Sequence, residues 1–478
     1  MQSYPRIIQG GMGIGVSHWR LAQAVAGHGG LGVVSGTGIG IVLARRLQNG
    51  DLDGAMRRAL AHFPVAAIAQ RVLTTYFLDG GKHADKPFKS VPMFTLHSRR
   101  ALLELVLCAN FVEVWLAKEG HEGQVGINLL EKVQLPHLVS LYGAMLAGVD
   151  YVLVGAGIPL QIPAILDALA RHERVTYRLE VSDARPEDSY MMTFEPHDFI
   201  AEGTPPLKRP GFLAIVASAT LAKMLVTKST GIVNGVIVEG PTAGGHNAPP
   251  RGKMHLSERG EPVYGPRDTV DVALLRELGV PFWLAGSYAR PQKLQEALQL
   301  GAAGIQVGSI FALCEESGML EDSKQELRRI GYSGVLETST DPLASPTGYP
   351  FKIAHIVGTL AASPIYAQRP RQCDIGRLRE MYRREDGAIG YRCPAEPIDA
   401  YLHKGGQQTD TVGRKCLCNA LMATIGLPQI QRNGYKEVPV LTLGDDVGFL
   451  SEILEHAEAS YTAADVLHYL QQGLAEGI

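Results

Sequence analysis

Residues 235–246 read GVIVEGPTAGGH, and this stretch decides the fold that the sequence predicts. Its apolar run ends in Glu239 and predicts a buried β-strand, and the glycine-rich turn after the strand leads to His246. In parallel sheets and barrels, the residues that follow a strand lie at the carboxyl edge, where α/β enzymes carry out their chemistry. The stretch therefore predicts a parallel α/β fold, and His246 is a candidate for acid–base chemistry.

The same order, a short apolar run followed by glycine, recurs along the first 320 residues. We expect eight strands, at 6–9, 31–35, 125–130, 151–154, 212–217, 235–239, 280–285 and 304–307. Amphipathic helices are expected between several of them, at 19–26, 138–147, 219–227, 270–278 and 291–300. This pattern predicts a TIM (β/α)8 barrel. A doubly wound open sheet would use the same units, but its main ligand turn would lie at one switch point, whereas here glycine follows nearly every strand.

Two stretches interrupt the repeat, and we expect both to be insertions at the barrel rims. Residues 41–120 contain strand-like runs at 91–96 and 111–116, and residues 171–210 contain a hairpin pattern that pairs 175–181 with 190–194. The composition shifts near residue 320, where turn formers and charged residues precede renewed helical patterns. The predicted organisation is a barrel domain over 1–320 and a mainly helical C-terminal subdomain over 321–478.

Length and composition are those of a large enzyme with ample core. The chain has 478 residues, of which 46% are hydrophobic, and its 45 basic and 48 acidic residues give a net charge of −3. Without a basic stripe, nucleic acid is not an expected partner. The start, MQSYPRIIQGGMGIG, has no export signal, and no window reads as a membrane span, so we expect a cytoplasmic protein without a membrane partner. The chain is compatible with a homo-oligomer.

Two glycine-rich or polar strand ends are candidate ligand contacts. The turn QGGMGIG at 9–15 follows the first strand, and its glycines would let the backbone approach a flat ligand or hold an anion. A tight strand-to-helix turn explains the same pattern. Asn128 lies near the end of the third strand, where its amide can both donate and accept hydrogen bonds to a heterocycle. A cap of the next turn is the alternative for Asn128.

Three further turns follow later strands. A single histidine is more often structural than catalytic, but the setting of His246 in TAGGH after a strand favours catalysis. The turns LAGS at 284–287 and QVGS at 306–309 follow the seventh and eighth strands. In many barrels the loops after these strands bind a phosphate, so the pair predicts a phosphorylated cofactor.

A metal site is not predicted. The four cysteines of the C-terminal region, Cys373, Cys393, Cys416 and Cys418, lack the compact two-cysteine knuckles of structural zinc sites. Sparse, scattered cysteines fit reduced, buried thiols better than a disulfide framework.

The motifs taken in order carry a family resemblance. The segments IIQGGMG, GINLL, VIVEGPTAGGH, WLAGS and ALQLGAAGIQVGSIF resemble the FMN-dependent nitronate monooxygenases, formerly called 2-nitropropane dioxygenases, over about the first 315 residues. Relatives of that family include flavin-dependent enoyl-acyl carrier protein reductases, among them the trans-acting reductases of polyunsaturated fatty acid and polyketide synthesis. The most specific element is AGGH after the sixth strand.

The resemblance implies FMN bound across the carboxyl face of the barrel and a role for each matching residue. Gly11, Met12 and Gly13 would line the isoalloxazine, Asn128 would reach its polar edge, and Ser218 would lie nearby. Gly244 and Gly245 would leave room for the ring, and His246 would be the acid–base residue. The phosphate would be held by four residues of the last two turns, Gly286, Ser287, Gly308 and Ser309.

Departures from the family bear on the substrate. Thr242 stands where many members have glutamate, Ser287 replaces a second glycine, and Ser309-Ile310 replaces a threonine–arginine pair. The resemblance implies an FMN-dependent oxidoreductase that oxidises nitronates or nitroalkanes, small-molecule substrates, with O2. The rim insertions and long C-terminal extension are more like the larger reductases, so the alternative is an enoyl-thioester reductase that uses NADPH and FMN on an acyl thioester. A flavin-free scaffold protein is the third hypothesis, and the glycine turns and His246 argue against it.

Overall fold

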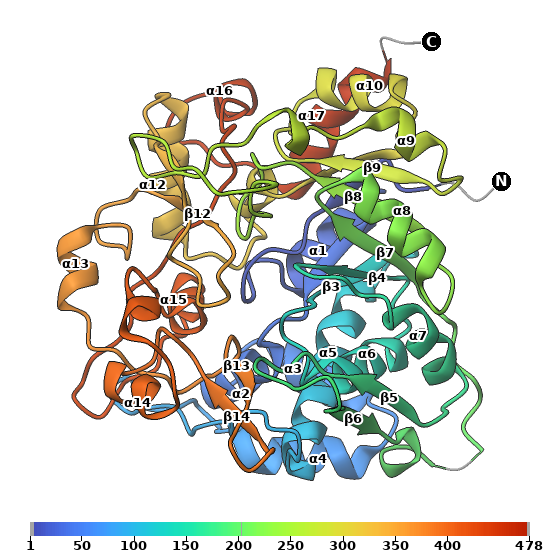
Figure 1. Ribbon diagram of the computed structural model, residues 1–478. Coiled ribbons are helices and arrows are strands. Elements are labelled where there is room, and N and C mark those ends of the chain that lie inside the picture. Colours follow the sequence, from blue (N-terminus) through green and yellow to red (C-terminus); the bar gives the residue numbers. More distant parts are fainter. Residues whose placement is uncertain (1–3, 202, 476–478) are drawn as a thin grey trace.

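The computed structural model describes residues 4–201 and 203–475, and a closed barrel of eight parallel strands lies within it (Figure 1). The strands are β1 (Ile7–Gln9), β2 (Gly32–Ser35), β3 (Val125–Leu130), β4 (Tyr151–Gly155), β7 (Gly211–Val216), β8 (Gly235–Glu239), β9 (Phe282–Ala285) and β10 (Gly304–Val307). They follow one another in chain order, β10 pairs with β1, and a parallel bridge between Ile8 and Leu31 joins β1 to β2. The predicted TIM barrel and its eight strands are confirmed.

The inside of the barrel is filled by side chains. Along β8, Ile237 belongs to the small cluster inside the barrel, whereas Val236 and Val238 pack into the larger core, as the two-residue period of a strand requires. Trp283 of β9 is fully buried in the inner cluster, and its indole N–H donates to Pro5 O at 2.7 Å. Because the interior is packed, a ligand has room only at an end of the barrel.

Helices surround the barrel, and those between successive strands include the five predicted ones. They are α1 (Trp19–Gly27), α6 (His137–Leu146), α7 (Ile162–Ala170), α8 (Ala219–Lys228), α9 (Val272–Arg276) and α10 (Pro291–Gln299). Their apolar faces lie against the strands, as α1 shows, where Leu21, Ala22 and Val25 are fully buried. The predicted helices at 19–26, 138–147, 219–227, 270–278 and 291–300 are thereby confirmed, with α9 shorter than expected.

The first insertion is helical, and the two strands predicted in it are wrong. It contains α2 (Ile39–Gln48), α3 (Ala55–Ala61), α4 (Ala66–Tyr76) and α5 (Arg100–Lys118). Residues 111–116 lie inside α5, which packs against α1, α2 and α6 and is buried on most sides, so its apolar residues do not show a one-sided helical period. Residues 91–96 form no regular structure.

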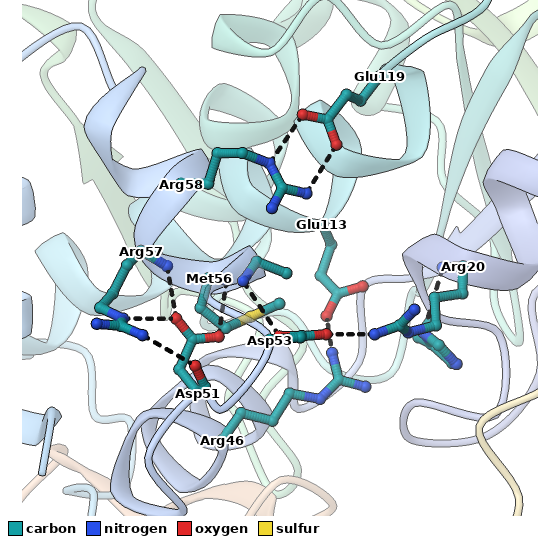
Figure 2. A network of polar contacts seen from close by, with 11 residues as sticks. Arg20, Arg46, Asp51, Asp53, Met56, Arg57, Arg58, Glu113 and Glu119 are labelled. Atoms are coloured by element: carbon teal, nitrogen blue, oxygen red, sulfur yellow. Dashed lines mark hydrogen bonds and ion pairs between the residues drawn. The ribbon is translucent and has the colours of Figure 1, made fainter. Parts of the chain in front are cut away.

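Ion pairs within this insertion hold its helices together (Figure 2), and one of the carboxylates also bonds to α1. Arg46 of α2 pairs with Glu113 of α5 at 2.6 Å, and the other oxygen of the same carboxylate accepts the backbone N–H of Trp19 at 2.8 Å. Glu113 therefore holds the start of α1, α2 and α5 together. Arg58 of α3 adds a two-fold contact to Glu119 just after α5, at 2.8 and 2.9 Å.

The second insertion contains the predicted hairpin. β5 (Val175–Arg178) pairs antiparallel with β6 (Met191–Phe194), and alternate residues are buried on one face. The hairpin at 175–181 and 190–194 is confirmed, with shorter strands.

After β10 and α11 (Ser309–Ala312) the chain forms helices and two antiparallel hairpins. The helices are α12 (Glu321–Tyr332), α13 (Ser363–Gln368), α14 (Ile398–His403), α15 (Leu417–Thr424), α16 (Leu450–Ile453) and α17 (Ala463–Ala475), and the hairpins are β11 (Thr338–Asp341) with β12 (Phe351–Ala354) and β13 (Glu380–Arg383) with β14 (Ile389–Arg392). The red helix α17 lies against α10 and α1 (Figure 1). A domain boundary near residue 320 stays a prediction.

Within the described ranges, no helix is both long and apolar enough to cross a bilayer.

Candidate functional site

A cavity lies at the carboxyl ends of the barrel strands, and it gathers nearly all the residues that the sequence pointed to. Its wall is made of the carboxyl ends of the barrel strands and the turns that follow them, chiefly those after β1, β8, β9 and β10, together with residues of the C-terminal region. The predicted residues in the wall are Gly11, Met12, Gly13, Asn128, Gly244, Gly245, His246, Gly286, Ser287, Gly308 and Ser309. The remaining one, Ser218, lines a neighbouring cavity together with His246. Its hydroxyl accepts the Leu221 N–H at 3.1 Å and caps α8.

The turn after β1 is held by two polar side chains. Ser17 Oγ accepts the Met12 backbone N–H at 2.9 Å and donates to Gly10 O at 3.0 Å. Gln9 Nε2 donates to Ser17 Oγ at 2.8 Å, while Gln9 Oε1 accepts the N–H of Val33 on β2 at 2.9 Å. The turn is therefore fixed to the barrel before any ligand binds.

Close packing explains the glycine at position 11. A Cβ on Gly11 would lie 2.3 Å from the Cβ of Asn128, a separation that atoms cannot adopt. Asn128 is buried at the cavity wall and packs directly on this turn. On the other side of the turn, Gln306 of β10 lines the cavity, and its buried Oε1 has no hydrogen-bond partner among the residues that the structure describes. An acceptor of this kind calls for a ligand that donates a hydrogen bond.

His246 is fixed by its backbone and by one hydroxyl group. Residues on both sides of it pair with the start of β12, through Lys352 N–H to Gly245 O at 2.8 Å and Asn247 N–H to Pro350 O at 2.9 Å. Its Nε2 lies 2.7 Å from the Oγ of Ser345, which is fully buried. Burial lowers the pKa of His246 to about 4, so the imidazole is neutral near pH 7 and can accept a proton.

A buried carboxyl group, that of Glu239, lines the same two cavities as His246. Glu239 is the last residue of β8. Burial raises the pKa of Glu239 to about 7, which places its titration near neutral pH. The sequence marked Glu239 only as a strand end. A buried acid at the carboxyl edge of a barrel is the signal that could have added it to the candidates.

The turn after β9 has a strained backbone. Gly286 has φ of +90° and Ser287 has φ of +58°, which is unfavourable for a residue with a side chain. A Cβ on Gly286 would lie 2.9 Å from Thr242 Oγ1, so this turn packs against the one that carries His246. Ser309 Oγ accepts the backbone N–H of Gly444 at 2.8 Å.

That last contact belongs to a part of the site that the sequence did not predict. Residues 440–446 of the C-terminal region run along the cavity mouth. Thr442 Oγ1 accepts the Gly245 N–H at 2.8 Å, and Asp446 pairs with Arg290 at 3.0 Å. A Cβ on Gly244 would lie 2.9 Å from the backbone of Leu443, so the glycine permits this close approach. Ser345 was also missed, although its segment was recognised as rich in turn formers.

The cysteines are thiols held away from water. Burial raises the pKa of Cys373 to about 12 and that of the thiols of Cys393, Cys416 and Cys418 as well. No group of three metal-ligating side chains with suitable geometry occurs in residues 4–201 and 203–475.

Part of the chain is similar to one family of known proteins. Residues 189–340 match the family model of nitronate monooxygenase. A probable nitronate monooxygenase of Bacillus subtilis (strain 168) is 32% identical over 139 residues, which make up 29% of this chain and 37% of that protein. The chain thus matches little more than a third of the length of this relative. The resemblance stated from the motifs is confirmed, over a shorter stretch than the 315 residues expected.

Solved structures resemble the chain at low sequence identity. FabK from Thermotoga maritima is 15% identical, with 99% of this chain and 93% of that chain covered and a TM-score of 0.49. Nitroalkane oxidase from Streptomyces ansochromogenes is 16% identical, with 98% and 95% covered and a TM-score of 0.48.

Proposed function

We propose, from the resemblance of this chain to the nitronate monooxygenase family, that it is an FMN-dependent oxidoreductase that oxidises nitronates or nitroalkanes with O2. The observation that carries the proposal is the convergence of the glycine turns and neutral His246 on one cavity at the carboxyl end of the barrel. A cytoplasmic location fits this function and belongs to the proposal.

The residues present fit FMN. The unpartnered Gln306 Oε1 suits a ring that donates an N–H, and the amide of Asn128 suits its polar edge. Gly245 has φ of +78° with no atom within 4 Å of a Cβ position, so the backbone leaves open space there. Gly286, Ser287, Gly308 and Ser309 would hold the phosphate. When bound, FMN supplies the transfer of electrons from the substrate to oxygen.

His246 would accept the proton that the substrate loses. A nitroalkane must lose a proton from the carbon that bears the nitro group, and a neutral imidazole beside that carbon can accept it. Ser345 orients the ring through Nε2, and the edge of the Phe351 ring, with centroids 4.9 Å apart, restricts its rotation. Glu239 is a second group in the same wall that can hold or release a proton near pH 7.

Anaerobic flavin reduction tests the proposal against its main rival. The purified protein with FMN is mixed without oxygen either with a nitronate or with NADPH, and the flavin absorbance is followed. Rapid bleaching by the nitronate supports the proposed activity. Rapid bleaching by NADPH with no response to nitronate would overturn it in favour of an enoyl-thioester reductase, and an absence of flavin bands after excess FMN would favour a scaffold protein.

A further inference from the structure

Arg377 is a buried cation at the cavity wall that has no ion pair in the described part of the chain. It lies in the C-terminal region before β13 and is one of the residues that line the main cavity. The residue is only 7% exposed, and among residues 4–201 and 203–475 its buried Nε and Nη1 have no hydrogen-bond partner. A buried charge without hydrogen bonds is strongly disfavoured in a folded protein, so this arrangement needs an explanation.

Two other buried arginines each have a carboxylate partner, which Arg377 lacks in the described part of the chain. Arg369 forms an ion pair with Glu437 at 3.1 Å, although both side chains are almost completely buried. Arg45 donates to Leu427 O at 2.6 Å and lies 3.7 Å from Asp374. The guanidinium of Arg377 instead lies over the ring of Phe94, with 4.8 Å between its central carbon and the ring centroid.

A second arginine adds positive charge near Arg377. Arg379 lies close enough to oppose the charge of Arg377, and its own donors are used by Phe94 O at 2.5 Å and Gly376 O at 3.1 Å. Burial lowers the pKa of Arg377 to about 10, so the group stays charged at neutral pH. The cavity wall therefore presents an uncompensated positive charge.

The position of Arg377 separates it from the turns assigned to the phosphate. It lines both the main cavity and a small cavity beside the ends of β2 and β3, and Thr37 and Leu130 line both with it. The phosphate turns follow β9 and β10, and β1 stands between β10 and β2 in the barrel. The FMN phosphate, as proposed, would therefore not neutralise Arg377.

We propose that Arg377 binds a planar oxyanion of the substrate, either a carboxylate or the nitronate group, and so makes the cavity selective for anionic substrates. This inference rests on the proposed function, in that it assigns the same cavity to the substrate. A guanidinium presents its N–H groups in one plane, which suits the two oxygens of a carboxylate or nitronate. The apolar neighbours Leu130, Leu378 and Leu421 would accommodate a short hydrocarbon part.

Binding of a non-reactive anion tests the inference without turnover. Propionate and the neutral propionamide are titrated into the FMN-loaded protein, and binding is followed by calorimetry and by the melting temperature. We expect propionate, and not propionamide, to bind the wild type, and we expect Arg377→Gln to weaken propionate binding roughly tenfold or more. Arg379→Gln is the matched control, because its guanidinium is already partnered and does not line the main cavity.

Stability supplies a second readout. Because the substitution removes no ion pair, and only the contact with the Phe94 ring, the anion-free Arg377→Gln protein should melt at nearly the same temperature as the wild type, whereas loss of a paired structural arginine would lower the melting temperature clearly. Equal propionate binding by wild type and Arg377→Gln, or no propionate binding by the wild type, would overturn the inference.

Turnover distinguishes the two sources of the anion. Arg377→Gln is compared with the wild type on two nitronates of equal chain length, one of which carries a terminal carboxylate. A raised KM for the carboxylate-bearing compound alone assigns Arg377 to the carboxylate, and a raised KM for both assigns it to the nitronate. Propionate binding that depends on Arg377 in a protein without nitronate turnover would overturn the proposed function and leave the anion site standing.

Discussion

His246 is the residue on which the proposed chemistry depends. Substitution to alanine removes the proton acceptor and leaves the glycine turns, so we expect FMN to stay bound and turnover to fall about 100-fold or more. The measurements are the flavin spectrum and kcat with a nitroalkane. A Ser218→Ala variant is the control, since Ser218 lies outside the main cavity and caps α8. Unchanged kcat in His246→Ala would exclude the role.

The pH dependence of His246 follows from its burial. The pKa is lowered to about 4, so the neutral base is present above that pH and is lost as the pH falls through it. A loss of activity near pH 7 would therefore have another source, and Glu239 is the candidate.

Glu239 should make stability depend on pH. Its carboxyl has a pKa raised to about 7 in the folded protein, whereas an unfolded chain ionises near the usual value of about 4.3. Between these values the folded state holds a proton that the unfolded state releases, so stability falls as the pH rises through this window. Buried histidines such as His246 act in the opposite direction below about pH 6.5, so the test is a difference. We expect the melting temperature of the wild type to fall relative to that of Glu239→Gln between pH 5 and 8, measured without FMN.

The Glu239→Gln substitution should reduce the dependence of the melting temperature on pH without abolishing it. Glu131 is also buried, and its pKa is likewise raised to about 7, so it contributes in the same direction. The exposed Glu258→Gln is the control. An identical slope in the wild type and Glu239→Gln would show that the carboxyl at the end of β8 is not held protonated.

At the scale of elements, the close packing of the turn after β1 on β3 can be tested by substitution. Gly11→Ala would place a Cβ 2.3 Å from that of Asn128, so the turn or β3 must shift, at a cost of about 1–3 kcal/mol. We expect a lower melting temperature without FMN and weaker FMN binding. Gly10→Ala is the matched control for stability, because its Cβ would meet Gln306 at an ordinary 3.5 Å. Equal stability of both variants would contradict the tight packing of Gly11.

Elements with a clear local pattern were predictable from sequence, and those without one were not. The eight strands are short apolar runs, and glycine ends or directly follows most of them, which separates them from the helices. Residues 111–116 form a strand-like apolar run, yet they lie in α5, whose burial on most sides erases the helical period. The same reasoning explains the site, since Gly11, Asn128 and His246 lie within strands or in the turns that follow them, whereas partners supplied by distant segments carry no local signal.

At the scale of the whole molecule, the C-terminal region supplies residues that contact the turns of the barrel site. Thr442 and Gly444 reach the turns of Gly245 and Ser309 across almost 200 and 135 positions of sequence, and only tertiary packing brings them there. A subdomain boundary near residue 320 can be proposed from composition. Composition does not reveal that residues 440–446 form part of the cavity mouth.

This shared site predicts that the barrel and the C-terminal region unfold together. Val440, Leu443 and Leu467 belong to the same continuous core as Ile7 and other barrel residues, so neither part keeps its packing without the other. We expect one calorimetric transition with equal calorimetric and van't Hoff enthalpies, and saturating FMN should raise its midpoint as a unit. Two transitions, of which FMN moves only one, would instead show that residues 321–478 fold as an independent domain.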